Sequence, residues 1–201
     1  MLSLDPETSR AARIERLIGY TGLPARYRAA SFETWVERRG TGAALRAAQA
    51  WAAAPILERG LFFVGPPGTG KTHLLAAAVL AKVQSSVAGI RWANVPLLLD
   101  RLRAAQRYTD SDSMESFAYM RDEARVVVLD DLGKERATDW ATERLYVLVE
   151  ARYGALRPTL ASTNRSLDEL AEAGYGALVS RLTETCEVVR LEASDYRVTG
   201  R

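Results

Sequence analysis

The sequence predicts one α/β domain in which helices cover both faces of a mainly parallel sheet. From about residue 60 onward, short apolar runs alternate with stretches of helical periodicity, which is the pattern of such a sheet. A glycine-rich loop joins the first run to a helix, and a later run, VVVL, has no polar alternation and ends in two aspartates. A length of 201 residues fits one domain of ordinary size.

Composition narrows the class of protein. Hydrophobic residues make up 48% of the chain and charged residues 26%, so a core can form and wholesale disorder is excluded. The net charge of +2 predicts no nucleic-acid partner by itself, because such affinity would need a local basic patch. Cys186 and His73 are the single cysteine and the single histidine, which excludes an internal disulfide and a zinc site built from these residues.

The same composition indicates the compartment. A chain without a disulfide fits the reducing cytoplasm. The first residues lack the apolar stretch of a secretion signal, and no window reaches ~18 uninterrupted apolar residues. We therefore expect a cytoplasmic protein with no membrane segment.

The first 59 residues are expected to pack on the main domain. Residues 1–18 are predicted to form a short basic helix, because Pro6 suits a first helical position and apolar residues recur at helical spacing. Its apolar residues are Ile14, Leu17 and Ile18, and its basic residues are Arg10, Arg13 and Arg16. Residues 19–59 are predicted to form an irregular strap with the aromatic anchors Phe32 and Trp35, then an alanine-rich helix over 41–59 that ends near Pro55.

Residues 60–201 are predicted to form the main domain, with helices between five strands. Strands are expected at 61–64, 90–95, 125–129, 158–162 and 187–191, and helices at 70–84, 96–108, 114–123, 138–153 and 176–184. A polar break is expected at 109–113. Gly154 is expected to close the preceding helix as its C-terminal cap.

Residues 65–72, GPPGTGKT, match the eight-position pattern G-x-x-x-x-G-K-[ST] of a phosphate-binding loop, between a predicted strand and a predicted helix. Glycines let backbone N–H groups turn toward a phosphate, Lys71 can reach the β- and γ-phosphate oxygens, and Thr72 offers a hydroxyl to Mg²⁺. A chance glycine-rich turn would give no reason for the lysine and the threonine. The residues predicted to bind ATP are Gly65, Pro66, Pro67, Gly68, Thr69, Gly70, Lys71, Thr72 and His73.

Two acidic residues close the buried run VVVL. Asp130 is expected to hold Mg²⁺ together with Thr72, and Asp131 to polarise an attacking water molecule. The alternative is that both aspartates cap a loop after a strand. The phosphate-binding loop makes that alternative weaker.

Three further residues are candidates for ATP hydrolysis. Asn164 closes the fourth strand, where its amide can reach the γ-phosphate or position the water, and a turn-forming asparagine is the alternative. Arg181 and Arg197 lie late in the chain, and a guanidinium near a transferring phosphate can be worth ~10³–10⁵ in rate. By themselves, both are better explained as surface arginines, because the chain has many arginines.

These motifs, taken in order, resemble those of a known family. GLPARYRAASFETW, GPPGTGKTHLL, VVVLDDLG, STN, SRL and SDYR resemble the bacterial replicative-helicase loader family (DnaC/DnaI type), a branch of the AAA+ ATPases. The resemblance covers about residues 20–198 and extends to the similar IstB-type transposition helper ATPases. It implies a P-loop NTPase of the AAA+ type, with a three-layer α/β/α domain, a five-stranded sheet and no C-terminal helical lid.

The resemblance implies a role for each motif residue. Lys71 and Thr72 bind ATP and magnesium, Asp130 and Asp131 form the second acidic motif, and Asn164 is the first sensor.

Arg181 occupies the arginine-finger position, which in the family reaches the nucleotide of a neighbouring subunit, and Arg197 is the second sensor. Catalysis is then expected to depend on self-association. Tyr27 and Phe32 lie in the segment that runs beside the nucleotide base in the family, although aromatic anchors of a strap explain them equally well.

The resemblance implies an ATPase that couples its nucleotide state to single-stranded DNA and to a replicative helicase. Residues 101–108 offer three arginines and a tyrosine for single-stranded DNA, and a solvated helix face whose apolar side is Leu97, Leu98 and Leu102 is the alternative. An IstB-like transposition helper on duplex DNA remains open. So does a nucleotide-gated adaptor with little turnover, because Asp131 stands where many hydrolysing relatives carry glutamate. A small-molecule kinase would need an acceptor pocket and a lid that the sequence does not show.

Overall fold

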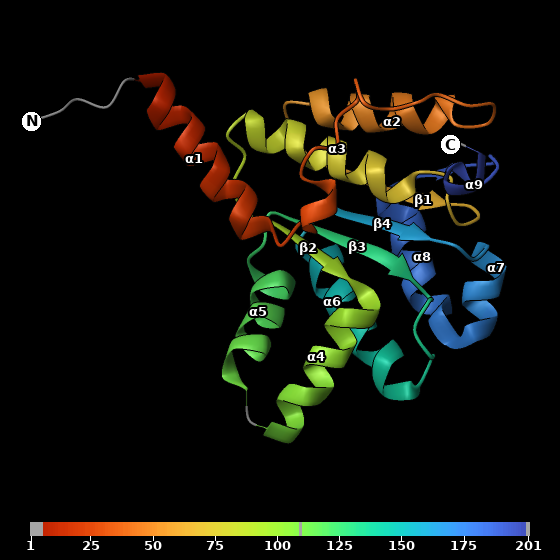
Figure 1. Ribbon diagram of the computed structural model, residues 1–201. Coiled ribbons are helices and arrows are strands. Elements are labelled where there is room, and N and C mark those ends of the chain that lie inside the picture. The colour runs from red at the N-terminus through yellow and green to blue at the C-terminus, as the bar shows by residue number, and fades with distance from the viewer. Residues whose placement is uncertain (1–5, 109, 200–201) are drawn as a thin grey trace, which may run out of the picture.

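The computed structural model describes residues 6–108 and 110–199. They form three layers, of which the middle one is a five-stranded sheet (Figure 1). The strands are β1 Gly60–Val64, β2 Ile90–Asn94, β3 Val126–Leu132, β4 Thr159–Thr163 and β5 Cys186–Arg190. Their order is β2-β3-β4-β1-β5, and every neighbouring pair is parallel. The predicted α/β fold is confirmed, and all five strands lie within three residues of their predicted bounds.

Helices cover the two faces of the sheet. One layer contains α1 Pro6–Thr21, the 3-10 turn η1 Ala25–Tyr27, α2 Gly42–Ala53 and α3 Lys71–Gln84. The other layer contains α4 Val95–Tyr108, α5 Ser111–Asp122, α6 Asp139–Gly154, α7 Leu167–Leu170, the π-helical turn η2 Ala171–Tyr175 and α8 Gly176–Thr185. A last short helix, α9 Tyr196–Thr199, follows β5.

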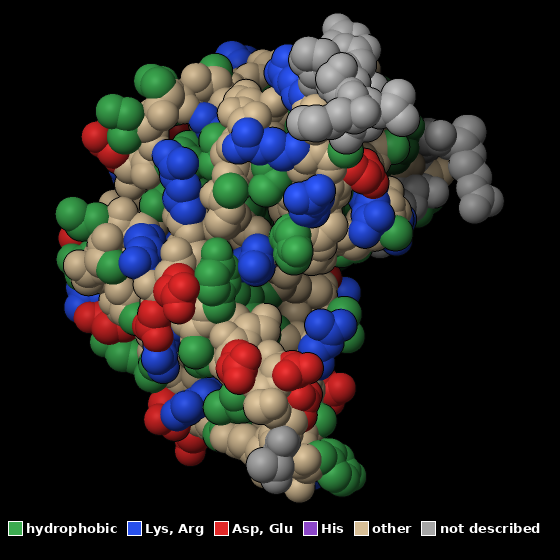
Figure 2. Space-filling model, turned by 90° about the vertical axis from the view of Figure 1, so that its left-hand side faces the viewer, with side chains coloured by type: hydrophobic (Ala, Val, Ile, Leu, Met, Phe, Trp, Pro, Cys, Tyr) green, Lys and Arg blue, Asp and Glu red, His purple; other side chains and the backbone are tan. Residues whose placement is uncertain are grey.

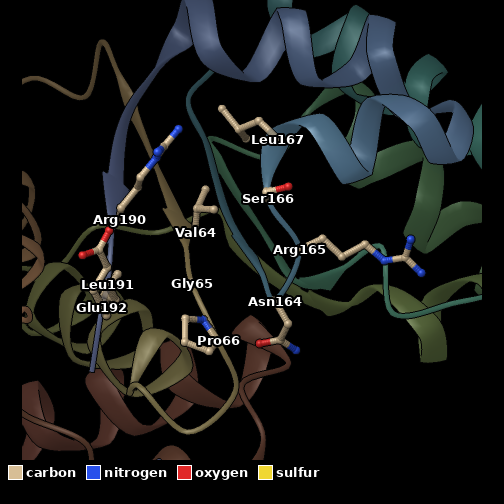
Figure 3. Close-up of a pocket in the computed structure, with 10 residues that line it drawn as sticks. All are labelled: Val64, Gly65, Pro66, Asn164, Arg165, Ser166, Leu167, Arg190, Leu191 and Glu192. Atoms are coloured by element: carbon tan, nitrogen blue, oxygen red, sulfur yellow. The ribbon is translucent and has the colours of Figure 1, made fainter. Parts of the chain in front are cut away.

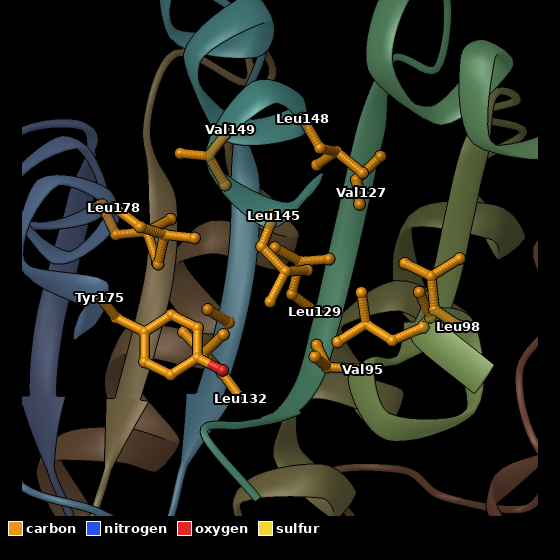
Figure 4. Packing of buried hydrophobic residues seen from close by; sticks show 14 of the residues in the cluster. Val95, Leu98, Val127, Leu129, Leu132, Leu145, Leu148, Val149, Tyr175 and Leu178 are labelled. Atoms are coloured by element: carbon orange, nitrogen blue, oxygen red, sulfur yellow. The ribbon is translucent and has the colours of Figure 1, made fainter. Parts of the chain in front are cut away.

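Strand β3 shows why the run VVVL has no polar position. Val126 and Val128 pack in the hydrophobic cluster of α1–α3, whereas Val127 and Leu129 pack in that of α4–α8. Figure 4 shows the second cluster, where α6 covers Val127 and Leu129. Because alternate residues of a strand point to opposite faces, a strand buried on both faces is apolar throughout.

The N-terminal segments cover the edge of the sheet. Helix α1 lies against α3 and β2, with Ile14, Leu17 and Ile18 packed on the core and Arg10, Arg13 and Arg16 exposed. The strap, which we define as residues 22–41, connects α1 with α2. Helix α1 therefore shields the edge strand β2, whose unpaired backbone groups would otherwise invite pairing with another chain.

Four local predictions need correction. The predicted break at 109–113 is largely helix, because the Asp110 carboxylate accepts hydrogen bonds from the N–H groups of Asp112 and Ser113 and so starts α5 three residues early; residue 109 lies outside the described residues. The turn α7–η2 was not predicted, although Ser166 and Glu169 form a capping box there. Strand β3 runs on through both aspartates instead of ending before them.

Gly154 does not cap α6. It is the last helical residue, and Leu156 instead takes the positive φ, +53°, that such an end requires. Within the described residues, no helix combines the length and apolar character needed to cross a membrane.

Candidate nucleotide-binding site

The glycine-rich loop, residues 65–70, connects the carboxyl end of β1 to the first turn of α3. Gly68 and Gly70 have φ angles of +73° and +97°. A Cβ on Gly70 would lie 2.4 Å from the Trp35 ring, so the strap packs against the loop where only a glycine fits. The loop thereby reaches the N-terminus of α3, where free backbone N–H groups and the helix dipole favour an anion.

Lys71 lies across this loop. Its Nζ donates to Gly65 O at 2.6 Å, to Pro66 O at 2.8 Å and to Thr69 Oγ1 at 3.4 Å, and the side chain is only 5% exposed. A buried ammonium group is stable only with such acceptors. Phosphate oxygens are stronger acceptors than carbonyl groups, so Lys71 is placed to give up these carbonyl groups when phosphate oxygens are present.

Asp130 forms the buried acidic centre of the site. Its Oδ1 accepts a hydrogen bond from Thr72 Oγ1 at 3.0 Å and another from Ser162 Oγ at 2.6 Å. Burial raises the pKa of Asp130, and the neighbouring Asp131 raises it further, against the opposing effect of these hydroxyl groups and of Lys71. A buried carboxylate beside a threonine hydroxyl is a set of hard oxygen ligands that fits Mg²⁺, which completes its shell with water and phosphate oxygens.

Asp131 forms hydrogen bonds with the other polar side chains at the carboxyl ends of the strands. Its carboxylate accepts from Asn94 Nδ2 at 3.3 Å, Asn164 Nδ2 at 3.4 Å and Lys134 Nζ at 3.1 Å. Its own N–H donates to Ser162 Oγ at 3.0 Å. Its φ of +63° accompanies a shift in the β3–β4 register between Leu129 and Leu132. Backbone conformations of this kind in non-glycine residues cluster at functional sites.

The structure thus brings together the loop, Thr72, Asp130, Asp131 and Asn164, at the carboxyl ends of β1, β3 and β4. Three members of the cluster were missed from the sequence, namely Asn94, Lys134 and Ser162. Asn94 ends β2 beside β3, with Asp130 as its register partner, and Ser162 lies two residues before Asn164. Their position as polar residues at the carboxyl ends of neighbouring parallel strands is the signal that would have identified Asn94 and Ser162.

Arg181 lies apart from this cluster. On α8, its Nε donates to Glu150 Oε2 at 2.8 Å, its Nη1 lies 3.8 Å from Glu184 Oε2, and its guanidinium stacks on the Tyr153 ring at 4.3 Å. The hydrogen bond to Glu150 raises the pKa of Arg181. These partners hold the guanidinium on the surface of α6 and α8.

Arg197 lies in α9, and its side chain is outside the described residues. The backbone places this helix at the loop, because Tyr196 N–H donates to Gly68 O at 3.0 Å. The residue that precedes Arg197 in the chain therefore contacts the phosphate-binding loop.

A cavity of about 260 Å³ adjoins the loop between the ends of β4 and β5 (Figure 3). Gly65, Pro66, Asn164 and Arg190 line it together with neighbouring residues, and the guanidinium of Arg165 points away from it. Asn164 therefore lines this cavity and also donates a hydrogen bond to Asp131.

The remaining candidates have mainly packing contacts. Tyr27 and Phe32 are partly buried against the cluster of α1–α3. His73 Nε2 lies 3.0 Å from Ser31 O, which ties the first turn of α3 to the strap. Cys186 is buried as expected, and burial raises the pKa of its thiol to about 12, so it is protonated at neutral pH.

The family model for IstB-like ATP binding proteins matches residues 8–201. Phage-like element PBSX protein XkdC of Bacillus subtilis (strain 168) is 28% identical over 155 residues, 72% of this chain and 54% of that protein. Uncharacterized protein YdaV of Escherichia coli (strain K12) is 28% identical over 179 residues, 87% of this chain and 70% of that protein. An insertion sequence ATP-binding protein of Sinorhizobium fredii is 28% identical over 142 residues, 68% of this chain and 46% of that protein. The chain thus spans about half the length of the first and third of these relatives.

Solved structures show the same architecture. The crystal structure of the DnaC helicase loader has a TM-score of 0.72 at 28% identity and covers 84% of this chain and 100% of its own. The crystal structure of DnaI has a TM-score of 0.71 at 22% identity, covering 86% of this chain and 93% of its own. Domain III of the Thermotoga maritima replication initiation protein DnaA has a TM-score of 0.72 at 23% identity, covering 87% and 70%. The last two similarities concern the fold alone.

Proposed function

The chain belongs to the family of IstB-like ATP-binding proteins and has the AAA+ fold, and from this premise we propose that it hydrolyses ATP with Mg²⁺ in an oligomer that acts on DNA. The observation that carries the proposal is the hydrogen-bonded cluster of Thr72, Asp130 and Ser162, beside Lys71 and the loop. Such a cluster combines a phosphate cradle, a hard-oxygen metal site and a second carboxylate.

Each side chain then has a distinct task. Lys71 would exchange the carbonyl groups of Gly65 and Pro66 for phosphate oxygens. Thr72 and Asp130 would hold Mg²⁺, which would supply positive charge against those oxygens. Asp131 orients the attacking water molecule, and Asn164, which donates to Asp131, fixes the direction of that carboxylate.

Arg181 acts on a neighbouring subunit in this scheme. Its contacts with Glu150, Glu184 and Tyr153 keep it on the outer surface of its own chain, where a second copy can meet it. A guanidinium supplied in trans stabilises charge in the transition state, so turnover depends on assembly.

Two variants test the catalytic proposal. Lys71→Ala is expected to lose nucleotide binding, measured with a fluorescent ATP analogue. Arg181→Ala is expected to keep binding and to lose phosphate release by at least about 100-fold, since arginine fingers are worth roughly 10³–10⁵. Turnover equal to that of the wild type in both variants would refute the scheme, and binding without turnover in the wild type would identify a nucleotide-gated adaptor.

The DNA-bound partner has two candidates. The likeness to the DnaC helicase loader at 28% identity favours single-stranded DNA and a replicative helicase. Membership of the IstB-like family and the insertion-sequence relative favour a transposition helper on duplex DNA. Pull-down with ATP on single-stranded DNA, on duplex DNA and with a helicase ring distinguishes them: retention of the ring supports the first, and filaments confined to duplex DNA support the second.

For single-stranded DNA, α4 offers the contact that we propose. Arg101 and Arg107 are exposed and Tyr108 is 80% exposed, whereas Arg103 stacks on the Trp140 ring at 4.9 Å. Leu98 and Leu102 are buried, but Leu97, which the sequence assigned to the apolar side, is 60% exposed. Figure 2 shows that, on the face carrying α1 and α5, basic side chains predominate in the upper part and acidic ones in the lower part. Helix α4 also lies in the lower part (Figure 1), so the positive charge that it would offer to a phosphate backbone is local.

A further inference from the structure

The side chain of Arg38 connects the strap, the phosphate-binding loop and the segment after β5. Its Nη2 donates to Gly68 O at 3.4 Å and to Thr69 O at 2.9 Å. Its Nη1 donates to Ser194 O at 2.5 Å, and the centre of its guanidinium lies 5.3 Å from the centre of the Tyr196 ring. One cation of the strap therefore holds two consecutive carbonyl groups of the loop.

The backbone of Arg38 is fixed by a turn just before α2. Arg38 N–H donates to Thr41 Oγ1 at 3.0 Å. Thr41 in turn donates to Arg38 O, from Oγ1 at 2.8 Å and from its N–H at 3.0 Å. Thr41 has 0% of its surface exposed. The guanidinium thus reaches the loop from a backbone position that is anchored in the core.

The two carbonyl groups determine where the next two N–H groups point. In a planar trans peptide, the C=O of one residue and the N–H of the next point in opposite directions. The described residues contain no cis peptide bond. Because Gly68 O and Thr69 O point toward Arg38, the N–H groups of Thr69 and Gly70 point away from it. These two N–H groups directly precede the first turn of α3, and loops of this sequence pattern bind phosphates with such groups.

The charge of Arg38 reinforces this direction. A cation at the oxygen end of a peptide group polarises that group, and hydrogen bonds in series strengthen one another. Each of the two peptide groups has Arg38 at its oxygen end and an N–H that is directed away from the cation. Tyr196 N–H donates to Gly68 O as well, at 3.0 Å, so the residue before Arg197 is attached to the same carbonyl group.

We propose that Arg38 is a positioning residue for the polyphosphate of the nucleotide. It holds the N–H groups of Thr69 and Gly70 in the direction in which they can donate to phosphate oxygens, and it attaches α9, which contains Arg197, to the same part of the loop. The inference rests on the proposed function, because it requires a polyphosphate in the loop. It deepens that function by naming a residue of the strap that prepares the loop before the nucleotide binds.

Affinity is the first test. Arg38→Met removes the donors and the charge, so it is expected to bind a fluorescent ATP analogue at least about tenfold more weakly. Arg38→Lys keeps the charge without the fork of donors and is expected to have an affinity between those of Arg38→Met and the wild type. Arg39→Met removes the same charge from the next, exposed residue and is expected to change the affinity less than about twofold. Unchanged affinity of Arg38→Met, or an equal loss in Arg39→Met, overturns the inference.

The direction of the N–H groups is the second test, by amide proton chemical shifts with and without a saturating, non-hydrolysable ATP analogue and Mg²⁺. In the wild type, the Thr69 and Gly70 amide protons are expected to move downfield as they donate to charged oxygens, and in Arg38→Met to move less than about half as far. The Thr72 amide is oriented by α3 and is expected to move equally in both proteins.

Shifts of Thr69 and Gly70 that are equal in the two proteins, or an equal reduction at Thr72, overturn the inference. If Arg38→Met does not fold, Arg38→Lys takes its place in both tests, with a smaller change in the same direction expected and with the same outcomes against it.

Lys71→Ala separates the two possible failures. A wild type that binds nucleotide no better than Lys71→Ala overturns the proposed function, and the role of Arg38 with it. If the wild type binds nucleotide and Lys71→Ala does not, unchanged affinity and unchanged amide shifts in Arg38→Met overturn the role of Arg38 alone.

Discussion

Asp130 is a carboxyl group whose burial serves the site and weakens the fold. With 4% of its surface exposed, its ionised form loses hydration and depends on the hydroxyl groups of Thr72 and Ser162. A pKa raised in the folded state means that the protonated group favours folding below the ordinary pKa of aspartate, and that this contribution disappears as the pH rises through the raised value.

The first prediction follows from that sign. Asp130→Asn is expected to raise the Tm at pH 7 by about 2–4 °C, which corresponds to roughly 1 kcal/mol in a chain of this size. The gain is expected to vanish at about pH 2.5, well below the ordinary pKa of aspartate, where Asp130 is protonated in both states. Thermal unfolding at the two pH values measures it, and a variant less stable than the wild type at pH 7 would contradict it. The same variant is expected to lose Mg²⁺-dependent turnover.

At the scale of elements, the end of α6 is strained where the sequence offered a glycine. Leu156 has φ +53° with its side chain 85% exposed, whereas Gly154 remains in the helix and a Cβ added to it would meet nothing within 4 Å. Left-handed backbone costs a residue with a Cβ roughly 1–2 kcal/mol. The strain is local to the turn between α6 and β4.

The second prediction concerns one substitution at each of these two positions. Leu156→Gly is expected to stabilise the protein by about 0.5–1 kcal/mol by relieving the strain, and Gly154→Ala by a similar amount through helix propensity. Urea unfolding with unchanged slope measures both. The reverse result for Leu156→Gly would mean that its side chain is buried in an assembly.

The buried side chain of Arg152 connects α5, α6 and β4 through hydrogen bonds. Arg152, with 0% of its surface exposed, donates all five N–H groups: Nε to Thr159 Oγ1, Nη1 to the carbonyl groups of Met120 and Ala124, and Nη2 to those of Arg125 and Pro158. Burial lowers its pKa to about 10, with Arg157 adding repulsion. One side chain therefore satisfies the carbonyl groups of the turns that precede β3 and β4.

The third prediction concerns this guanidinium. Arg152→Lys has three donors for five acceptors and is expected to cost about 2–3 kcal/mol, and Arg152→Met about 3–5 kcal/mol, because buried carbonyl groups lose their partners. The midpoint of urea unfolding measures both. Arg121→Lys, on an exposed pair with Asp122, is the control and should leave the midpoint almost unchanged. A Met variant as stable as the wild type would show that water replaces the guanidinium.

At the scale of the whole molecule, the proposed active centre is divided between subunits. Lys71→Ala retains Arg181 but lacks the lysine of the loop, whereas Arg181→Ala retains the loop but lacks the guanidinium. Each variant alone is therefore expected to be inactive. Mixing them should restore part of the turnover, because some interfaces then combine an intact loop with an intact guanidinium. Phosphate release at constant total protein measures this. An inactive mixture that still forms oligomers would contradict action in trans.

Much of the fold follows from local pattern. The strand–loop–helix unit of β1, residues 65–70 and α3 was predicted because glycines, a lysine and a change of hydrophobic period lie in consecutive residues. The start of α5 was wrong by three residues because the cap of Asp110 involves only short-range hydrogen bonds that a polar run does not distinguish from a loop. The turn α7–η2 was missed for the same reason.

The layered α/β fold, the residues of the loop and its two aspartates could all be read from the sequence, because period, glycine and charge act between near neighbours. Which distant groups meet these residues became known only from the packed structure. Asn94 reaches Asp131 because β2 lies beside β3. Arg38 and Asp195 reach Gly68 because the strap and residues 192–196, from opposite ends of the chain, both pack on the loop. Contacts across such separations depend on the packing of all the layers at once, which no local pattern records.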